Sequence, residues 1–575
     1  MSEMLKQQKK TERKYTPALS MKHFCEIIGA HGYKVAYMWF DSAHELHEMT
    51  YRELSDSIKN LSAAFASFGW QGRRIAILSE TSPQWVITYA AAVTSGNVAI
   101  PLDKELKLEE LEGFLRFAEA DALVYSGAFN RALEDKVKNN PAVSLFIPMS
   151  LEDCPYAGED NVMSFDELLA RGERHVAGGY ELPEPDDLNR MAIMLFTSGT
   201  TGTSKCVMLS EKNFISCVNA ACECVEFFPE DTIVSVLPIH HTYELSCMMA
   251  ALNYGMNIGI NDSLKRVLKN FSFFRPTGLV LVPLFVNTMY KKIWEEAKKK
   301  KKDKILRAAL AASTRLRRVG IDLRRVLFSD IISAFGGRLC KIICGGAPLN
   351  PEIAKKFDEF GITVCEGYGI TECSPLISVN PYYARKHGSI GPTVNCCTAR
   401  IYPEGVNELG YAEGEIQVKG DNVMLGYYKN PEATAEVFTE DGWFCTGDVG
   451  YMDEDGYLYI TGRKKSVIVL ENGKNVFPEE IEEYLGNLDT VAECVVVGRK
   501  KENNPETIVL TAIIYPNFDA FPVGTDISEI AKAVQAEVNA MNRGLVGYKQ
   551  VRKVEIRKTE FEKTTSRKIK RHLVK

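Results

Sequence analysis

The stretch MAIMLFTSGTTGTSKC occupies residues 191–206 and joins two contrasting kinds of sequence. Its first five residues are apolar, as in a buried β-strand, whereas hydroxyl residues and two glycines fill positions 197–203. Glycine lets the backbone turn so that N–H groups converge, and serine and threonine hydroxyls add further donors. A strand followed by such a loop, which ends in Lys205, indicates a loop that wraps phosphate groups.

A flexible Ser/Thr/Gly linker is the alternative interpretation of residues 197–203. Linkers rarely end a buried strand and rarely stop at a placed lysine, so this alternative is disfavoured. The loop also lacks the GxxxxGK[ST] pattern of a Walker A motif, which disfavours a P-loop kinase.

The sequence around this loop alternates between helical and strand-like segments. In residues 51–126 two helical patterns precede the strand-like runs RIAIL and NVAIPL, which predicts a doubly wound α/β layer with parallel strands. Residues 177–189 are rich in glycine, proline and acids and indicate a linker. From about Gly388 to Asp455 short runs broken by glycine and proline predict a β-rich subdomain. After Lys465 a smaller α/β segment begins, with strands in VAECVVVGR and TIVLTAIIYP.

Composition bounds the class of protein. The chain has 575 residues, of which 45% are hydrophobic and 25% charged, as in an ordinary globular protein. A net charge of -6 gives no reason to expect nucleic acid as a partner. No apolar run reaches the ~18 residues of a membrane span, and no secretory signal is recognisable. The 15 cysteines are an odd number without zinc-type spacing and predict reduced thiols in a cytoplasmic protein. The HELH of residues 44–47 lacks the HExxH order of a zinc hydrolase.

Further motifs follow the phosphate loop along the chain. They are LPIHH (237–241), GGAP (345–348), YGITE (368–372), TGD (446–448), GRKK (462–465), NGKNVFPEEIE (472–482) and KTTSRKIKR (563–571). In order and spacing they resemble the motifs of the adenylate-forming (AMP-binding) superfamily, which includes acyl-CoA synthetases, luciferases and peptide-synthetase adenylation domains. The resemblance implies an α/β N-terminal domain over residues 1–464, with a β-rich subdomain from about 388, and a small α+β lid over 465–575.

The resemblance also implies which residues bind ATP. Asp448 is expected at a turn after Gly447, where its carboxylate can accept hydrogen bonds from both ribose hydroxyls, although an isolated Gly-Asp is more often an Asx-turn. Arg463 is expected on a second turn, on the ribose or phosphate side, and the adenine is expected between glycine backbone and the ring of Tyr368. The nucleotide-binding set is Thr197, Ser198, Gly199, Thr200, Thr201, Gly202, Lys205, Gly345, Gly346, Ala347, Tyr368, Gly369, Thr371, Asp448, Arg463 and Gly473.

Glu372 is the candidate metal ligand. It offers hard carboxylate oxygens beside the hydroxyl of Thr371, a pair suited to holding Mg²⁺ against triphosphate oxygens. Outside this motif such a residue would more often be an exposed acid in a surface turn.

The LPIHH segment contains two adjacent histidines. Counting from Leu237, the family's catalytic histidine corresponds to His241 rather than His240. Relatives that activate amino acids place an aspartate nearby to bind the substrate ammonium. This segment offers Glu244 but no aspartate, which weighs against an amino acid as the substrate.

The C-terminal motif KTTSRKIKR could be a solvated basic tail. By resemblance, Lys568 instead corresponds to the lysine that offsets negative charge on the α-phosphate during adenylation. Resemblance further implies that the lid turns at the hinge Lys465 and presents the loop around Gly473 to the thiol of coenzyme A. The chain departs from the family pattern at Arg567, where glycine is usual, and at Ser204 and Cys206, beside Lys205.

Residues 291–325 are strongly basic, with 14 Lys or Arg against 4 Asp or Glu, a net charge of +10. The stretch is expected to form one long charged helix. A solvated helix face is the simplest interpretation, and peripheral attraction to anionic lipids at the inner face of a membrane is the alternative. Together with the stretch LFSDIISAFGGRLCKIICGGAPL, this region resembles long-chain acyl-CoA synthetases.

The resulting hypothesis is a ligase that uses ATP, Mg²⁺ and coenzyme A to activate a medium- or long-chain fatty acid. Two alternatives stay open. The ligase could take another acid or an acyl carrier protein, or the chain could be a non-catalytic nucleotide-binding protein at a membrane.

Overall fold

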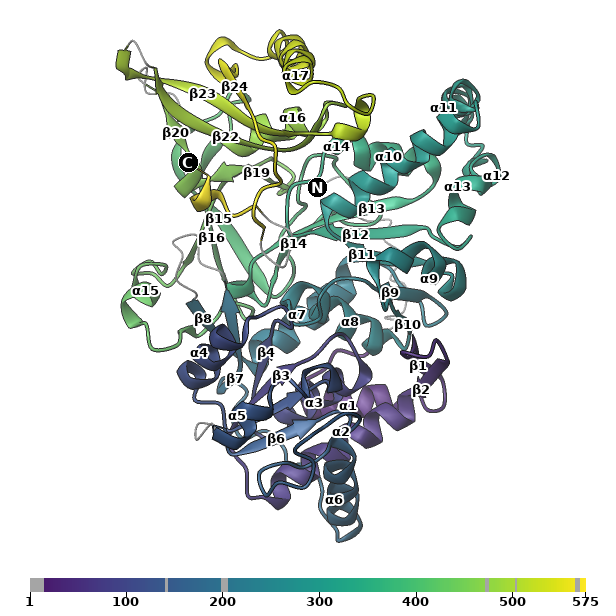
Figure 1. Ribbon diagram of the computed structural model, residues 1–575, viewed down its shortest axis with the longest axis vertical. Helices are drawn as coiled ribbons and strands as arrows, with labels where there is room; N and C mark the ends of the chain where they lie inside the picture. The colour runs from purple at the N-terminus through teal and green to yellow at the C-terminus, as the bar shows by residue number, and fades with distance from the viewer. Residues whose placement is uncertain are drawn as a thin grey trace. The chain divides into compact units, whose positions relative to one another are not determined.

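The protein is described by a computed structural model that covers residues 15–139, 143–197, 205–470, 475–501, 504–563 and 569–574 (Figure 1). The chain divides into two compact units. The first comprises the described residues up to Thr197 together with Lys205–Thr398 and Val418–Phe438. The second comprises Ala399–Gln417 and the described residues from Thr439 onward.

The first sheet of the first unit has seven strands in the order β17-β8-β7-β4-β3-β5-β6. Its inner strands β4, β3 and β5 pair in parallel, whereas β7 and β8 form an antiparallel hairpin. Their apolar runs are continuous because helices cover a parallel sheet on both faces. The strands are β3 (Arg74–Leu78), β4 (Val98–Leu102), β5 (Ala122–Tyr125), β6 (Leu145–Pro148), β7 (Met191–Thr197), β8 (Lys205–Ser210) and β17 (Gly426–Tyr427).

The second sheet has eight strands in the order β14-β13-β12-β11-β9-β10-β1-β2. The strands from β13 to β1 are parallel, and the edge strands β14 and β2 are antiparallel to their neighbours. The strands are β1 (Val35–Phe40), β2 (Leu46–Thr50), β9 (Thr232–Ser235), β10 (Asn257–Ile260), β11 (Gly278–Leu281), β12 (Lys341–Gly345), β13 (Thr363–Gly369) and β14 (Leu376–Val379).

Helices cover both sheets, and local sequence explains where several of them begin and end. α2 starts at a capping box in which Thr50 and Glu53 exchange hydrogen bonds. α14 has a proline in its first turn and ends at Gly361, whose φ of 87° requires glycine. The helices of the first unit are α1 (Met21–Ala30), α2 (Tyr51–Ser67), α3 (Pro83–Thr94), α4 (Leu108–Ala118), α5 (Glu134–Asn139), α6 (Phe165–Ala177), α7 (Glu211–Cys224), α8 (Thr242–Tyr254), α9 (Val267–Phe274), α10 (Pro283–Lys299), α11 (Asp303–Arg318), α12 (Arg324–Leu327), α13 (Ser329–Ala334), α14 (Pro351–Phe360) and α15 (Pro431–Ala435).

The basic region is not one long charged helix, as its sequence suggested, but two helices. α10 ends at Lys299 and α11 begins at Asp303, with Lys301 between them in the left-handed conformation at φ 53°. Like charges three and four residues apart destabilise a helix. Five consecutive lysines at 298–302 therefore account for the break.

The stretch predicted to be β-rich, from about Gly388 to Asp455, contributes Ala399–Gln417 and the residues from Thr439 onward to the second unit. One sheet has the order β15-β16-β18-β19, and a second has the order β22-β23-β24. The second sheet packs with helices α16 and α17 around a core of aliphatic side chains between Ile468 and Val551. The elements are β15 (Cys397–Val406), β16 (Ala412–Gly420), β18 (Phe444–Met452), β19 (Leu458–Arg463), β20 (Ile468–Val469), β21 (Asn475–Val476), α16 (Pro478–Gly486), β22 (Val491–Lys501), β23 (Asn504–Pro516), α17 (Ile527–Asn542) and β24 (Lys553–Ile556).

Short 3₁₀ helices join many of these elements. They are η2 (Gly127–Phe129), η3 (Leu264–Arg266), η4 (Thr371–Cys373), η5 (Lys464–Ser466), η6 (Phe518–Ala520), η7 (Gly547–Lys549) and η8 (Arg571–Leu573). The predicted α/β fold with a β-rich part is confirmed.

Candidate functional site

The β7–β8 hairpin frames the expected phosphate loop. Thr197 and Lys205 are its last cross-strand pair, and the hydroxyl of Thr197 lies 3.4 Å from the carbonyl oxygen of Lys205. Residues Ser198, Gly199, Thr200, Thr201 and Gly202 lie between them, outside the described residues. The two ends of the loop are thus held side by side at the end of a sheet.

Tyr427, which lies in none of the sequence motifs, connects this hairpin to the candidate metal ligand. β17 pairs with β8, with Tyr427 opposite Val207. The ammonium group of Lys205 lies 4.3 Å from the centre of the Tyr427 ring. The hydroxyl of Tyr427 donates a hydrogen bond of 2.8 Å to Oε1 of Glu372. Burial, and then the negative charge of Glu372, raises the pKa of Tyr427, so its hydroxyl stays a donor.

Glu372 has the chemistry needed to hold a divalent cation. It is half-buried within η4, directly after Thr371, and its backbone carbonyl accepts a bond from the N–H of Met424. Tyr427 uses one oxygen of the carboxylate, whereas an ionised carboxylate has two oxygens and about four acceptor positions. The side chain is therefore anchored without being saturated, which fits the role of an oxygen ligand for Mg²⁺.

The remaining motifs of the first unit follow the carboxyl ends of neighbouring parallel strands. The LPIHH segment follows β9, GGAP begins at the last residue of β12, and YGITE runs from the end of β13 into η4. The sheet order β13-β12-β11-β9 brings these segments to one edge. This edge is where open α/β sheets bind their ligands.

Backbone geometry explains the glycines at this edge. A Cβ atom on Gly345 would lie 3.1 Å from the carbonyl oxygen of Gly367, and Gly346 has a φ of 85°. A Cβ atom on Gly369 would lie 2.0 Å from the carbonyl oxygen of Pro375. Ala347 is exposed, so a ligand can approach the loop. The ring of Tyr368 is only 7% exposed, so it offers little open face to a base.

The two histidines of LPIHH differ in their surroundings. His240 is buried, its Nε2 lies 3.6 Å from Oδ2 of Asp103, and burial lowers its pKa. His241 is less buried and forms the N-cap residue of α8. The ring centres of the two residues lie 4.2 Å apart. The choice of His241 as the catalytic histidine stays a prediction.

Glu244, the acid that stands in place of an aspartate after LPIHH, is fully buried in the first turn of α8. Its Oε1 accepts a hydrogen bond of 2.5 Å from the hydroxyl of Ser235, at the end of β9. Burial raises the pKa of Glu244 to about 8, against the lowering effect of Ser235 and of the amides of Val236 and Leu237. The carboxyl group thus ties α8 to the start of the segment that carries the histidines.

In the second unit, Asp448 and Arg463 lie opposite each other on the antiparallel strands β18 and β19. The guanidinium Nε of Arg463 lies 3.0 Å from Oδ1 of Asp448, which is 3% exposed. Neither residue lies in a turn, as the sequence had suggested, because the strands extend through TGD and up to GRKK. Only the preceding Gly447, with a φ of 73°, has turn-like geometry.

Lys465 is exposed in η5, directly after β19. Its neighbour Lys464 forms ion pairs with Glu404 at 2.6 Å and with Glu415 at 3.1 Å. The two remaining predicted site residues, Gly473 and Lys568, lie outside the described residues. Their roles stay predictions.

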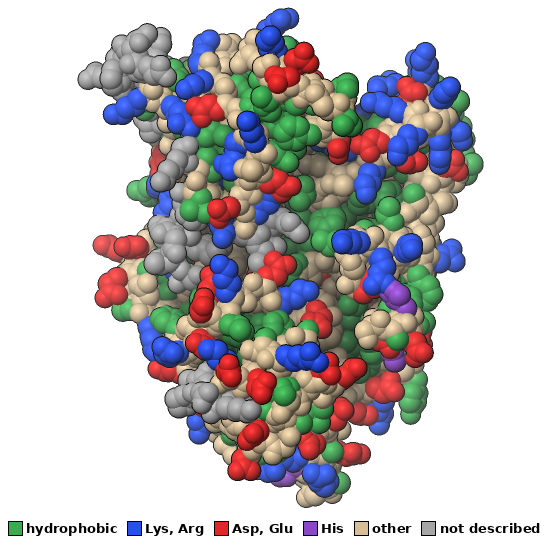
Figure 2. Space-filling model, in the orientation of Figure 1, with side chains coloured by type: hydrophobic (Ala, Val, Ile, Leu, Met, Phe, Trp, Pro, Cys, Tyr) green, Lys and Arg blue, Asp and Glu red, His purple; other side chains and the backbone are tan. Residues whose placement is uncertain are grey.

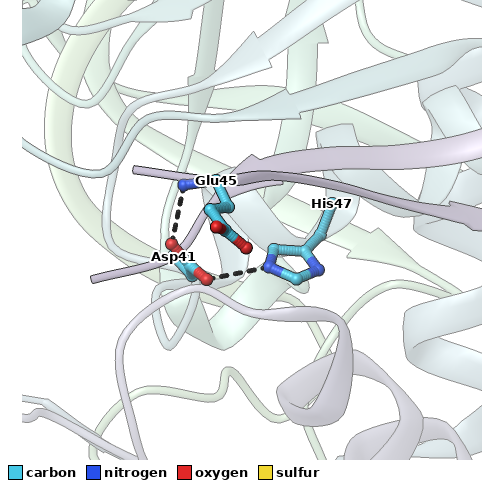
Figure 3. Close-up of side chains that lie close together, drawn as sticks. All are labelled: Asp41, Glu45 and His47. Atoms are coloured by element: carbon cyan, nitrogen blue, oxygen red, sulfur yellow. Dashed lines mark hydrogen bonds and ion pairs between the residues drawn. The ribbon is translucent and has the colours of Figure 1, made fainter. Parts of the chain in front are cut away.

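The HELH stretch runs from the loop after β1 into the first two residues of β2 (Figure 3). Asp41, Glu45 and His47 bring one ligand atom each to within 4.8 Å of one another. Oδ2 of Asp41 lies 2.9 Å from Nε2 of His47, and Oδ1 accepts the N–H of Glu45 at 2.8 Å. These hydrogen bonds explain the cluster as the closure of an exposed hairpin.

Cysteines contribute no activated thiol to the hairpin. Cys206, next to Lys205, is 2% exposed, and burial raises its pKa to about 12.

No helix among the described residues is long and apolar enough to cross a bilayer.

Comparisons with known proteins define the class. Residues 27–428 match the AMP-binding enzyme family, and residues 465–575 match the AMP-binding enzyme C-terminal domain. The chain therefore belongs to the AMP-binding enzyme family.

Its curated relatives include several ligases. Long-chain-fatty-acid–CoA ligase 5 of Rattus norvegicus is 29% identical, over 82% of this chain and 72% of the relative. Long-chain-fatty-acid–CoA ligase FadD15 of Mycobacterium tuberculosis is 27% identical, over 92% of this chain and 90% of the relative. The peroxisomal long chain acyl-CoA synthetase 6 of Arabidopsis thaliana is 30% identical, over 78% and 66%.

Solved structures share the fold. The adenylation domain of a carboxylate reductase from Mycobacterium chelonae superposes with a TM-score of 0.78 at 22% identity, over 97% of this chain and 90% of that one. ATP-bound MatB from Rhodopseudomonas palustris superposes with a TM-score of 0.70 at 25% identity, over 96% and 98%. The adenylate-forming enzyme fold is thereby confirmed.

Proposed function

We propose that this chain is an AMP-forming fatty acid–CoA ligase, which activates a medium- or long-chain fatty acid with ATP and transfers the acyl group to coenzyme A. The observation that carries the proposal is the link from Lys205 through Tyr427 to Glu372. Through this link, the ammonium group of Lys205 and the carboxylate of Glu372 both contact Tyr427, beside the hairpin that frames the expected phosphate loop. The fatty acid and the acceptor are supported by the relatives, which are named long-chain-fatty-acid–CoA ligases.

The chemistry overcomes the poor reactivity of a carboxylate. The carboxylate oxygen attacks the α-phosphorus of ATP, pyrophosphate leaves, and an acyl-AMP forms. The thiol of coenzyme A then attacks the acyl carbonyl, loses its proton, and AMP leaves with the bonding electrons. Both steps build negative charge on oxygen, which placed cations stabilise.

Residues of this chain are assigned as follows. Lys205 and the loop from Thr197 to Gly202 bind the phosphates, and Lys568 offsets charge at the α-phosphate. Asp448 and Arg463 bind the ribose side, and the GGAP and YGITE segments bind the adenine. A divalent cation held by Glu372, beside the hydroxyl of Thr371, would supply positive charge against the triphosphate oxygens.

We assign residues 465–575 to a lid that turns at Lys465 between the two half-reactions. The proposal also includes a cytoplasmic location with peripheral membrane contact through residues 291–325. The net charge of +10 in this stretch supports that contact.

The test is ATP–pyrophosphate exchange over a panel of acids, followed by assay of the thioester. Fatty acids should give the highest kcat/KM, and each added methylene should contribute up to about 0.8 kcal/mol, or roughly fourfold, until the pocket is filled. Benzoates and amino acids serve as the matched non-fatty acids.

Each part of the proposal can fail separately. An aryl or amino acid with the highest kcat/KM would contradict the fatty acid assignment. Faster transfer to an acyl carrier protein than to coenzyme A would contradict the acceptor. Nucleotide binding without exchange for any acid would favour the non-catalytic alternative.

A further inference from the structure

A basic groove lies on the first unit, apart from the residues assigned to ATP. It has a volume of about 520 Å³ and is walled by α10, α11 and α14. Its lining residues include Trp294, Arg307, Leu310, Arg315, Arg318 and Lys356. We call this site the basic groove.

Helical spacing explains how the basic groove is built. Arg307, Leu310, Arg315 and Arg318 recur at intervals of three to five residues and therefore share one face of α11. Leu310 is buried in a small cluster with Phe328 and Phe360, which anchors that face to the protein. The guanidinium of Arg307 lies 4.9 Å from the centre of the Trp294 ring. The groove thus combines an apolar floor with cationic walls.

The positive charge of the basic groove is largely uncompensated. Among the described residues, none of Arg307, Arg315 and Arg318 has a carboxylate within the 4.0 Å of an ion pair. Glu359 is the acid among the lining residues. Its Oε2 lies 2.9 Å from Nζ of Lys356, so this carboxylate compensates the charge of the lysine and not that of the arginines. Guanidinium groups stay charged at all physiological pH values and match phosphate oxygens in shape. Arg315 and Arg318, about one turn apart on α11, can contact one phosphate together, whereas Arg307 lies about two turns further toward the start of the helix and suits a second phosphate.

Exposed apolar side chains directly follow the groove-lining helix. α11 ends before Gly320, whose φ of 82° turns the chain into residues 319–327, which we call the apolar tip. The exposed side chains of the tip, between 40% and 72% exposed, are Val319, Ile321, Leu323, Val326 and Leu327. Clusters of exposed apolar residues mark interaction sites on otherwise polar surfaces. Figure 2 shows Lys and Arg side chains gathered over α11 and α12 with hydrophobic side chains beside them.

We propose that the basic groove and the apolar tip together form a docking site for a bilayer that contains anionic phospholipid. The arginines bind the phosphates of lipid headgroups, and the apolar tip inserts at the level of the headgroups. Basic residues beside exposed apolar ones are the combination that holds proteins at an anionic interface. The site deepens the membrane contact of the proposed function, and docking would bring the enzyme to a bilayer in which fatty acids partition.

The test is sedimentation of the full chain with vesicles, without ATP. Vesicles of phosphatidylcholine with phosphatidylglycerol should bind the chain, and vesicles of phosphatidylcholine alone should bind it far more weakly. Arg307→Gln, Arg315→Gln and Arg318→Gln together should weaken binding by about fivefold per arginine. Val319→Ser with Val326→Ser should weaken it further, whereas added salt should weaken mainly the arginine contribution.

A matched variant separates the basic groove from diffuse attraction. Lys298→Gln, Lys299→Gln and Lys300→Gln remove the same charge from exposed positions at the end of α10. An equal loss in this variant would contradict a discrete groove. Full competition by millimolar glycerol 3-phosphate would show that the site takes a free phosphate rather than a lipid.

The outcome is independent of the ligase assignment. ATP–pyrophosphate exchange with a short, water-soluble fatty acid should be unchanged in the arginine variant, which also shows that it folds. Retained vesicle binding in that variant would overturn the docking site whatever the exchange assay gives. Lost exchange with normal vesicle binding would instead bear on the proposed function.

Discussion

Tyr427 lies between two opposite charges, with Lys205 on its ring face and Glu372 on its hydroxyl. Tyr427→Phe keeps the ring and removes only the hydrogen bond to Glu372. Because groups that orient a metal ligand commonly affect metal affinity by 10-fold or more, we expect about a tenfold rise in the Mg²⁺ concentration for half-maximal pyrophosphate exchange. Glu372→Gln, which removes the charge, should raise it further.

The neighbouring Tyr428 provides the control. Its hydroxyl donates to Oε2 of Glu119 at 2.9 Å, away from the candidate metal ligand. Tyr428→Phe should leave the Mg²⁺ dependence as it is. Equal effects of the two tyrosine variants, or none for Glu372→Gln, would remove Glu372 from the metal site.

Glu244 makes stability depend on pH. Its pKa is about 8 in the folded chain against 4.5 for an ordinary glutamate, so the folded state binds more protons between these values. The stabilising contribution is complete below about pH 4.5 and is lost as the pH rises through 8. Glutamine mimics the protonated form of Glu244. We therefore expect the melting temperature of Glu244→Gln to fall less between pH 5 and 9 than that of the parent chain.

Thermal melts over this pH range measure the difference. Glu295→Gln, at an exposed position of α10, should keep the parent's pH dependence. A Glu244→Gln chain with the same slope as the parent would mean that the carboxylate is ionised when folded.

At the scale of single elements, η5, which follows β19, contains the proposed hinge. A variant at this hinge should affect one half-reaction and leave the other intact. Lys464 forms ion pairs with Glu404 and Glu415, and the proposed hinge residue Lys465 directly follows it. Proline at 465 fixes its φ and restricts the residue before it. We expect Lys465→Pro to slow thioester formation from supplied acyl-AMP while acyl-AMP formation survives.

Lys568→Ala should do the opposite and reduce acyl-AMP formation by about 10²–10³-fold, the scale of losing one electrostatic contact in a transition state. Lys465→Ala, which removes the charge and leaves the backbone free, is the control for the proline. Assay of each half-reaction separates the outcomes. Equal loss of both halves in Lys568→Ala would point to a folding defect or to another role, and no loss in either would mean that a different lysine acts.

Elements also show what sequence patterns can predict. RIAIL and NVAIPL were recognisable as parallel strands because a strand covered on both faces is apolar throughout. Asp448 and Arg463 were placed in turns, since a pattern of Gly-Asp or Gly-Arg does not reveal that two strands align them. The break between α10 and α11 depends on repulsion within a lysine run, which a periodicity of apolar residues does not contain.

On the scale of the whole molecule, motifs predicted the class and the fold, whereas contacts between distant segments were not predictable. Tyr427 reaches Glu372 across 55 residues of sequence and lies on a two-residue strand. The basic groove likewise requires three helices that converge only when the chain is folded. Neither contact leaves a local pattern that a single sequence could display.

Burial of Cys206 bears on how such an enzyme tolerates its own intermediate. An acyl-AMP acylates any accessible thiolate, and this chain carries 15 cysteines, one of them beside Lys205. Burial raises the pKa of Cys206 to about 12, so its thiol stays protonated at pH 7, and the side chain is closed to solvent. Protection against self-acylation is thereby built into the packing of the β7–β8 hairpin, and an incoming pantetheine thiol does not have to compete with that cysteine for the acyl group.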